Sequence, residues 1–187
     1  MRAVAFLSIL ALSIAARTSA GELAGVTLPD QIQVDSRTLL LNGMGLREAT
    51  FLKVDVYVAG LYLETKSSDP GAIIRSGQAK RLVMKFVRAV DRKDLVKAWD
   101  EGFKESAGAS LPALRDRVAT FDSYMSDVPN GAVMSFTSLP GTGVLVEIQG
   151  AAKGTIAGTD FSEALFGIWL DSHPPNPGLK DGLLGTH

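Results

Sequence analysis

The stretch LNGMGLREATFLKVDVYVAGLYLE, residues 41–64, decides the fold of this chain. A glycine pair and one arginine, Arg47, precede a run in which apolar side chains alternate with a mixed set that includes Tyr57. This period of two residues, from residue 51 to residue 64, predicts a strand with one apolar face and one mixed face. A mixed face suits a cavity wall, but a solvated face has the same pattern.

Two interpretations of Arg47 compete at the start of this strand. One is a surface or structural arginine. The other is a cation placed to meet an anionic ligand, because a guanidinium stays charged and offers a fork of donors to a carboxylate or an enolate. At the end of an apolar cavity such a cation would act more strongly than in water. Tyr57, on the strand that follows, could share the same anion through its hydroxyl group.

The glycines at positions 43 and 45 follow an apolar strand pattern, so we expect them to form a turn with positive φ angles. A dinucleotide site is not indicated, because no helix with the required glycine spacing comes next.

The rest of the chain predicts strands and helices in separate blocks. Short strands break at Pro29 and Asp30, and a hairpin turns at Pro140 and Gly141. Between them the pattern predicts a short helix at 67–77, a strand at 80–90, and amphipathic helices at 91–108 and 110–125. Another helix is expected at 159–171. This order favours an α+β fold with a large antiparallel sheet and a layer of helices on one face.

The first 20 residues have the pattern of a secretory signal peptide. Arg2 precedes an apolar segment that is short for a membrane span, and small residues stand before Gly21. An uncleaved N-terminal anchor is the alternative. We therefore expect residues 1–20 to be removed and residues 21–187 to form one domain, periplasmic or secreted. No other segment is long and apolar enough to span a bilayer, so no stable membrane insertion is expected after cleavage.

Composition excludes several classes of function. The chain has no cysteine, which excludes thiol catalysis and cysteine-ligated metals. Its two histidines, His173 in a proline-rich turn and His187 at the terminus, do not favour a metal site or a serine–histidine triad. No basic run indicates nucleic acid as a partner. We read the charged helix residues Asp100, Glu101 and 115–117 as solvated faces.

The quoted stretch resembles the chalcone isomerase superfamily, in which a glycine turn, an arginine and a G-[VL]-Y-L-E strand recur. The segments KRLVMKFVRAVDRKDLVKAWDEGF, GTGVLVEIQGAAKGTIAGTDFSEALFGIWLD and GLKDGLLG are similar to the bacterial chalcone isomerase-like branch. The resemblance implies an open-faced β-sandwich, with a cleft between the sheet and the helices. It also implies that Arg47 matches the arginine that stabilises the enolate in true isomerases.

Other positions depart from the plant isomerases. Tyr57 stands where those enzymes have a threonine, and Val87 lies near their lysine, with Arg88 beside it. The helix that follows lacks their tyrosine and asparagine, and Ile168 falls near a second threonine. Non-catalytic relatives include plastid fatty-acid-binding proteins, in which an arginine and a tyrosine hold the carboxylate. Arg47 and Tyr57 fit that chemistry better than they fit cyclisation.

Three hypotheses follow. The first is a non-catalytic periplasmic binder of a small amphipathic anion such as a fatty acid, with an apolar cleft and Arg47 at its head. It needs no cofactor or metal and is expected to be a monomer. The second is a chalcone–flavanone-type isomerase, an intramolecular lyase in which Arg47 is catalytic. The third is a partner-binding or structural protein with a closed core. For the first, face and register suggest these ligand-binding residues: Arg47, Tyr57, Met84, Phe86, Trp99, Phe103 and Ile168.

Overall fold

A curved antiparallel sheet organises the molecule, whose computed structural model describes residues 20–49 and 52–186. The predicted signal peptide lies outside the described residues except for Ala20. Seven strands form the sheet in chain order, each antiparallel to its neighbours. They are β3 (Gln31–Val34), β4 (Arg37–Ala49), β5 (Val54–Leu63), β6 (Lys80–Phe86), β7 (Val133–Leu139), β8 (Gly143–Ile148) and β9 (Ala151–Ile156). Strands β1 (Ala20–Leu23) and β2 (Val26–Pro29) pair separately.

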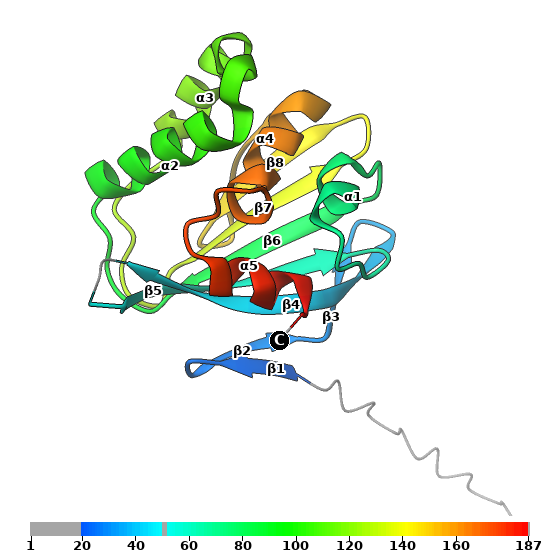
Figure 1. Ribbon diagram of the computed structural model, residues 1–187, viewed down its shortest axis with the longest axis vertical. Coiled ribbons are helices and arrows are strands. Elements are labelled where there is room, and N and C mark those ends of the chain that lie inside the picture. Colours follow the sequence, from blue (N-terminus) through cyan, green and yellow to red (C-terminus); the bar gives the residue numbers. More distant parts are fainter. Residues whose placement is uncertain (1–19, 50–51, 187) are drawn as a thin grey trace, which may run out of the picture.

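Helices cover one face of this sheet, and the β1–β2 pair lies on the other side (Figure 1). The helices are α1 (Pro70–Arg75), α2 (Arg92–Ala107), α3 (Leu111–Ser123), α4 (Thr159–Leu170) and α5 (Pro177–Leu184). Helix α4 is buried along most of its length and contacts α1, α2 and α5, while α5 packs on β4 and β5. The α+β fold with helices layered on an antiparallel sheet is confirmed.

The main core lies between the sheet and the helices. Alternation along β6 buries Leu82, Met84 and Phe86 toward the helices, as the period of two predicted. Aromatic rings fill the centre, with neighbouring ring centroids 5.3–6.1 Å apart. These rings belong to Trp99, Phe103, Phe121, Phe136, Phe161 and Trp169. Their tilted and edge-on arrangement suits the quadrupoles of aromatic rings and fixes α2, α3 and α4 against the sheet.

A second, smaller core lies on the opposite face of β4 and β5. Val26 and Leu28 of β2 pack there against Leu39, Val58 and Tyr62. The Tyr62 hydroxyl donates to the carbonyl oxygen of Pro29 at 2.9 Å, which ties the β1–β2 pair to the sheet. Both faces of β5 are therefore buried from residue 57 to residue 63. The mixed face of the sequence pattern is the one that faces the helices.

The predicted glycine turn is wrong, because Gly43 and Gly45 lie inside β4. Only glycine leaves room there, because the backbone of α5 packs directly against the backbone of β4. A Cβ atom on Gly43 would lie 2.1 Å from the carbonyl oxygen of Gly182, and one on Gly45 would lie 2.3 Å from that of Leu179. A bulge between Leu41 and Gly43 accompanies this contact.

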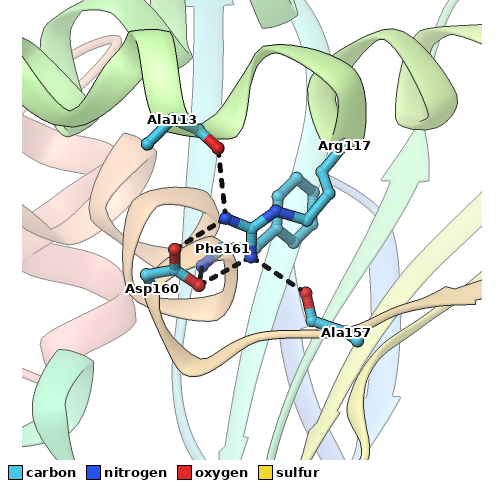
Figure 2. Close-up of polar contacts among 5 residues, drawn as sticks. All are labelled: Ala113, Arg117, Ala157, Asp160 and Phe161. Atoms are coloured by element: carbon cyan, nitrogen blue, oxygen red, sulfur yellow. Dashed lines mark hydrogen bonds and ion pairs between the residues drawn. The ribbon is translucent and has the colours of Figure 1, made fainter.

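A bidentate ion pair joins α3 to the start of α4 (Figure 2). Arg117 Nη1 and Nη2 lie 2.7 and 2.6 Å from the two carboxylate oxygens of Asp160, and Nη1 also donates to the carbonyl oxygen of Ala157. The prediction of a solvated role for Arg117 is wrong for this reason. The Arg117 guanidinium lowers the pKa of Asp160 below its usual range.

Candidate functional site

A cavity of about 580 Å³ lies between the sheet and α2. Its floor consists of side chains from β4, β5 and β6, and its roof is one edge of α2, with contributions from α4 and from the loop that follows it. The apolar and aromatic lining residues are Ala49, Val56, Tyr57, Met84, Phe86, Ala89, Val90, Leu95, Ala98, Trp99, Ile168 and Pro175. The volume falls in the range of small-molecule sites.

Arg47 and Tyr57 lie opposite each other in the β4–β5 register. Side chains at such positions share one face of a sheet, so both reach the cavity from the same side. The ladder shifts between Arg47 and Glu48, and bulges of this kind redirect side chains. Arg47 is half-buried, and its Nη1 donates to the carbonyl oxygen of Glu48. The cation therefore stands at the strand end that borders the cavity.

The Tyr57 side chain is held by α4. Its hydroxyl oxygen accepts a hydrogen bond of 2.9 Å from Nε1 of Trp169, and the residue is only 8% exposed. Burial raises the pKa of Tyr57 to about 12, against the opposing effects of the Trp169 hydrogen bond and the Arg47 charge. Tyr57 therefore stays protonated at ordinary pH, so its hydroxyl keeps a proton that it can donate.

The apolar residues suggested from the sequence divide into two groups. Met84, Phe86, Trp99 and Ile168 line the cavity. Phe103 does not, because it is fully buried one helical turn beyond Trp99, where its ring contacts Phe121 and Phe161. Helical spacing placed Trp99 and Phe103 on the same stripe. It could not show that this stripe meets the cavity at one end and the closed core at the other.

Sequence reasoning missed Arg88 as a cavity residue. Val87 packs against the second core, so alternation continues from Phe86 to Arg88 on the cavity side. This places a second, exposed cation at the mouth. The period of two in residues 82–86 indicates that Arg88 shares the face of Phe86. The strand ends at Phe86, however, and the sequence alone does not show that the alternation continues beyond it.

Carboxylates from α2 and from the residue before it also border the cavity. Glu101 was predicted to be solvated and is exposed, with a 3.9 Å contact to Nζ of Lys97. His173 is also exposed at the rim, where its Nδ1 lies 2.9 Å from the Ser172 hydroxyl. The acidic residues at the mouth are Asp91, Asp94, Glu101 and Glu105. Within the described residues, no group of three or more histidine, cysteine or acidic side chains is arranged to hold a metal ion.

A family model described as chalcone isomerase-like matches residues 20–185. The chain belongs to the chalcone isomerase-like family. Among solved structures, it is similar to a fatty-acid binding protein of Arabidopsis thaliana, with a TM-score of 0.72 and 16% sequence identity. The match covers 89% of this chain and 96% of the plant protein. This likeness confirms the fold implied by the resemblance, and a search of curated proteins finds no match.

In the part of this chalcone isomerase-like protein that the structure describes, no helix is both long and apolar enough to cross a membrane. The described fold begins at Ala20, the last residue of the predicted signal peptide and the first of β1.

Proposed function

We propose that this protein is a non-catalytic binder of a small amphipathic anion such as a fatty acid. One observation carries the proposal: Arg47 and Tyr57 are direct neighbours at the border of a cavity of about 580 Å³ that has apolar and aromatic side chains in its lining and charged residues at its rim. The guanidinium offers only donors, and the phenol hydroxyl, whose oxygen accepts from Trp169, keeps one proton to donate, which suits a carboxylate. The acyl chain lies against Met84, Phe86 and Ile168, where burial contributes about 0.8 kcal/mol per methylene.

The fold supports this proposal, because the similar plant structure is described as a fatty-acid binding protein. Apolar side chains at positions that are polar in the plant isomerases support it as well. Ile168 lines the cavity near the position where the plant isomerases carry a threonine, and Phe86 and Trp99 provide aromatic walls. An acyl chain meets apolar surface at each of these places.

A chalcone–flavanone-type isomerase is the second candidate, favoured by Arg47 alone. The arginine borders the cavity, as an enolate-stabilising cation must. Turnover of a chalcone by the wild type, abolished in Arg47→Ala, would establish this activity and replace the proposed one. A closed structural core is a poorer fit to a cavity of this volume.

The proposed setting is the periplasm or the cell exterior, with the protein acting as a monomer. The N-terminal pattern of residues 1–20 supports the location. Cell fractionation, together with the N-terminal sequence of the mature protein, tests both the compartment and the cleavage before Gly21.

Native mass spectrometry of the purified protein, followed by lipid extraction, tests the binding function. We expect a fatty acid or similar anion to co-purify with the wild type and to be lost from Arg47→Ala. Arg115→Ala is the matched control, because Arg115 is an exposed arginine of α3 outside the cavity. If Arg47→Ala retains the ligand as fully as Arg115→Ala does, Arg47 is not the head-group cation.

A further inference from the structure

The hydrogen bond from Trp169 to Tyr57 restricts how the tyrosine hydroxyl can be used. An indole N–H is a donor only, so Trp169 occupies a lone pair on the Tyr57 oxygen, 2.9 Å away. The hydroxyl proton remains available for an acceptor. None of the hydrogen bonds among the described residues uses that proton, although Tyr57 is nearly fully buried. A buried donor of this kind normally has a partner.

Trp169 is itself held in place. It is 1% exposed in α4, and its ring contacts Trp99 at a centroid distance of 5.7 Å and Phe136 at 6.0 Å. Tyr57 accepts from this fixed indole and also lines the cavity, and Arg47 lies opposite it in the β4–β5 register. Trp169 does not line the cavity, so an acceptor for the hydroxyl proton would come from a ligand in the cavity, beside the cation.

We propose that Trp169 is a positioning residue that directs the Tyr57 hydroxyl proton toward the head group of the ligand beside Arg47. The inference rests on the proposed binding function and names the residue that sets its head-group selectivity. Trp169 acts through Tyr57 rather than by contact, since it is not among the residues that line the cavity. Its effect should therefore depend on the tyrosine hydroxyl being present.

A double-mutant cycle tests this dependence, with dodecanoate and uncharged 1-dodecanol as probes. We expect Trp169→Phe and Tyr57→Phe each to weaken dodecanoate binding about tenfold. Dodecanol binding should stay within about twofold of the wild type, because a neutral alcohol oxygen accepts a weaker hydrogen bond than a carboxylate does. In the Tyr57→Phe background, Trp169→Phe should cause no further loss of dodecanoate affinity. Tyr62→Phe is the matched control, because it removes a buried hydroxyl from the opposite face of β5.

Indole NMR signals provide a second measurement that does not require the Trp169 variant to fold. The chain has two tryptophans, and Trp99 Nε1 has no acceptor in the described part of the molecule. Dodecanoate should shift the Trp169 indole N–H signal in the wild type, because hydrogen bonds in a chain polarise one another. The shift should disappear in Tyr57→Phe and persist in Tyr62→Phe.

The outcomes separate the two proposals. Additive losses in the double mutant, or an equal Trp169 signal shift in Tyr57→Phe, overturn the positioning role and leave the binding function standing. Failure of the wild type to bind dodecanoate or any co-purified anion overturns the binding function and the positioning role together. A loss confined to dodecanoate and cancelled by Tyr57→Phe establishes Trp169 as the residue that orients the donor.

Discussion

Asp122, near the end of α3, is a carboxylate in an unfavourable place. Its Oδ1 is buried without a partner in the described structure. Burial, with a smaller contribution from the charge of Asp100, raises its pKa from 3.8 to about 6 despite the nearby Arg92. The folded state therefore holds a proton that the unfolded chain has already released between about pH 4 and pH 6. Stability falls as pH rises through that window.

Asp122→Asn should consequently stabilise the protein at neutral pH. We expect the free energy of unfolding at pH 7.5 to rise by about 1 kcal/mol, a value reduced for partial solvent screening. The gain should shrink toward pH 4, where the wild-type carboxyl is protonated. Urea unfolding at several pH values measures this. Asp116→Asn, an exposed change on the same helix, is the control, and an equal gain there would contradict the explanation.

Lys80 is the buried cation of β6, with 2% of its surface exposed. Its Nζ donates to the carbonyl oxygens of Ile73, Ile74 and Ser76 at 3.0–3.1 Å, and it lies 5.5 Å from the Phe166 ring centroid. It thus satisfies the carbonyl groups at the end of α1. Burial lowers the pKa of Lys80.

Lys80→Met keeps the length of this side chain and removes its three donors. We expect the free energy of unfolding to fall by about 3 kcal/mol, because three carbonyl groups at the end of α1 lose a charged donor. Thermal unfolding compared with Lys153→Met, an exposed lysine of edge strand β9, provides the measurement. Equal changes in the two variants would show that the carbonyl contacts contribute little.

At the scale of elements, the contact between α5 and β4 depends on two glycines. Gly45→Ala should destabilise the protein by at least about 2 kcal/mol, since the new methyl group would meet the Leu179 carbonyl oxygen. Gly77→Ala is the matched control, because a Cβ there meets nothing within 4 Å. Denaturant unfolding of both variants tests the prediction. A Gly45→Ala protein as stable as Gly77→Ala would mean that α5 can move away without cost.

The role of these two glycines could not be predicted from the sequence. A glycine pair after a strand pattern has the same appearance whether it turns the chain or admits another backbone, and only the position of α5 separates the two. The same holds for the second core, whose β1–β2 cover is distant from β5 in sequence. By contrast, the stripe of Leu95 and Trp99 on α2 and the alternation of β6 were predictable, because each periodicity is local.

The candidate site shows the same division. Arg47 and Tyr57 were predictable as neighbours, because they flank one connection and the register of such a pair is short-range. The roles of Arg88 and Trp169 were not predictable. The position of Arg88 depends on how the chain continues after β6, and that of Trp169 on how α4 packs against the sheet, and no local pattern determines either. Phe103 lies outside the cavity lining for a related reason: a helical stripe does not reveal which of its turns faces the cavity and which the closed core.

For the whole molecule, ligand binding and folding should be coupled. A ligand that binds only the folded state raises the free energy of unfolding by about 2.7 kcal/mol at a concentration one hundred times its Kd. We expect dodecanoate to raise the Tm of the wild type in a concentration-dependent manner and to leave Arg47→Ala nearly unchanged. Scanning calorimetry measures both. A similar rise in Arg47→Ala would indicate that the acyl chain alone accounts for binding.

Strand β5 is enclosed by a core on each face and by a hydrogen-bonded strand on each edge. Its backbone amides between residues 57 and 63 can therefore meet deuterium only when both layers come apart. The exchange of these amides should report global unfolding. The amides of β9, an edge strand with an exposed surface, should exchange through local opening that requires less free energy. The amides of the strand that carries Tyr57 would then exchange most slowly in the molecule. Tyr57 would keep its position beside the cavity while the residues at the rim fluctuate locally.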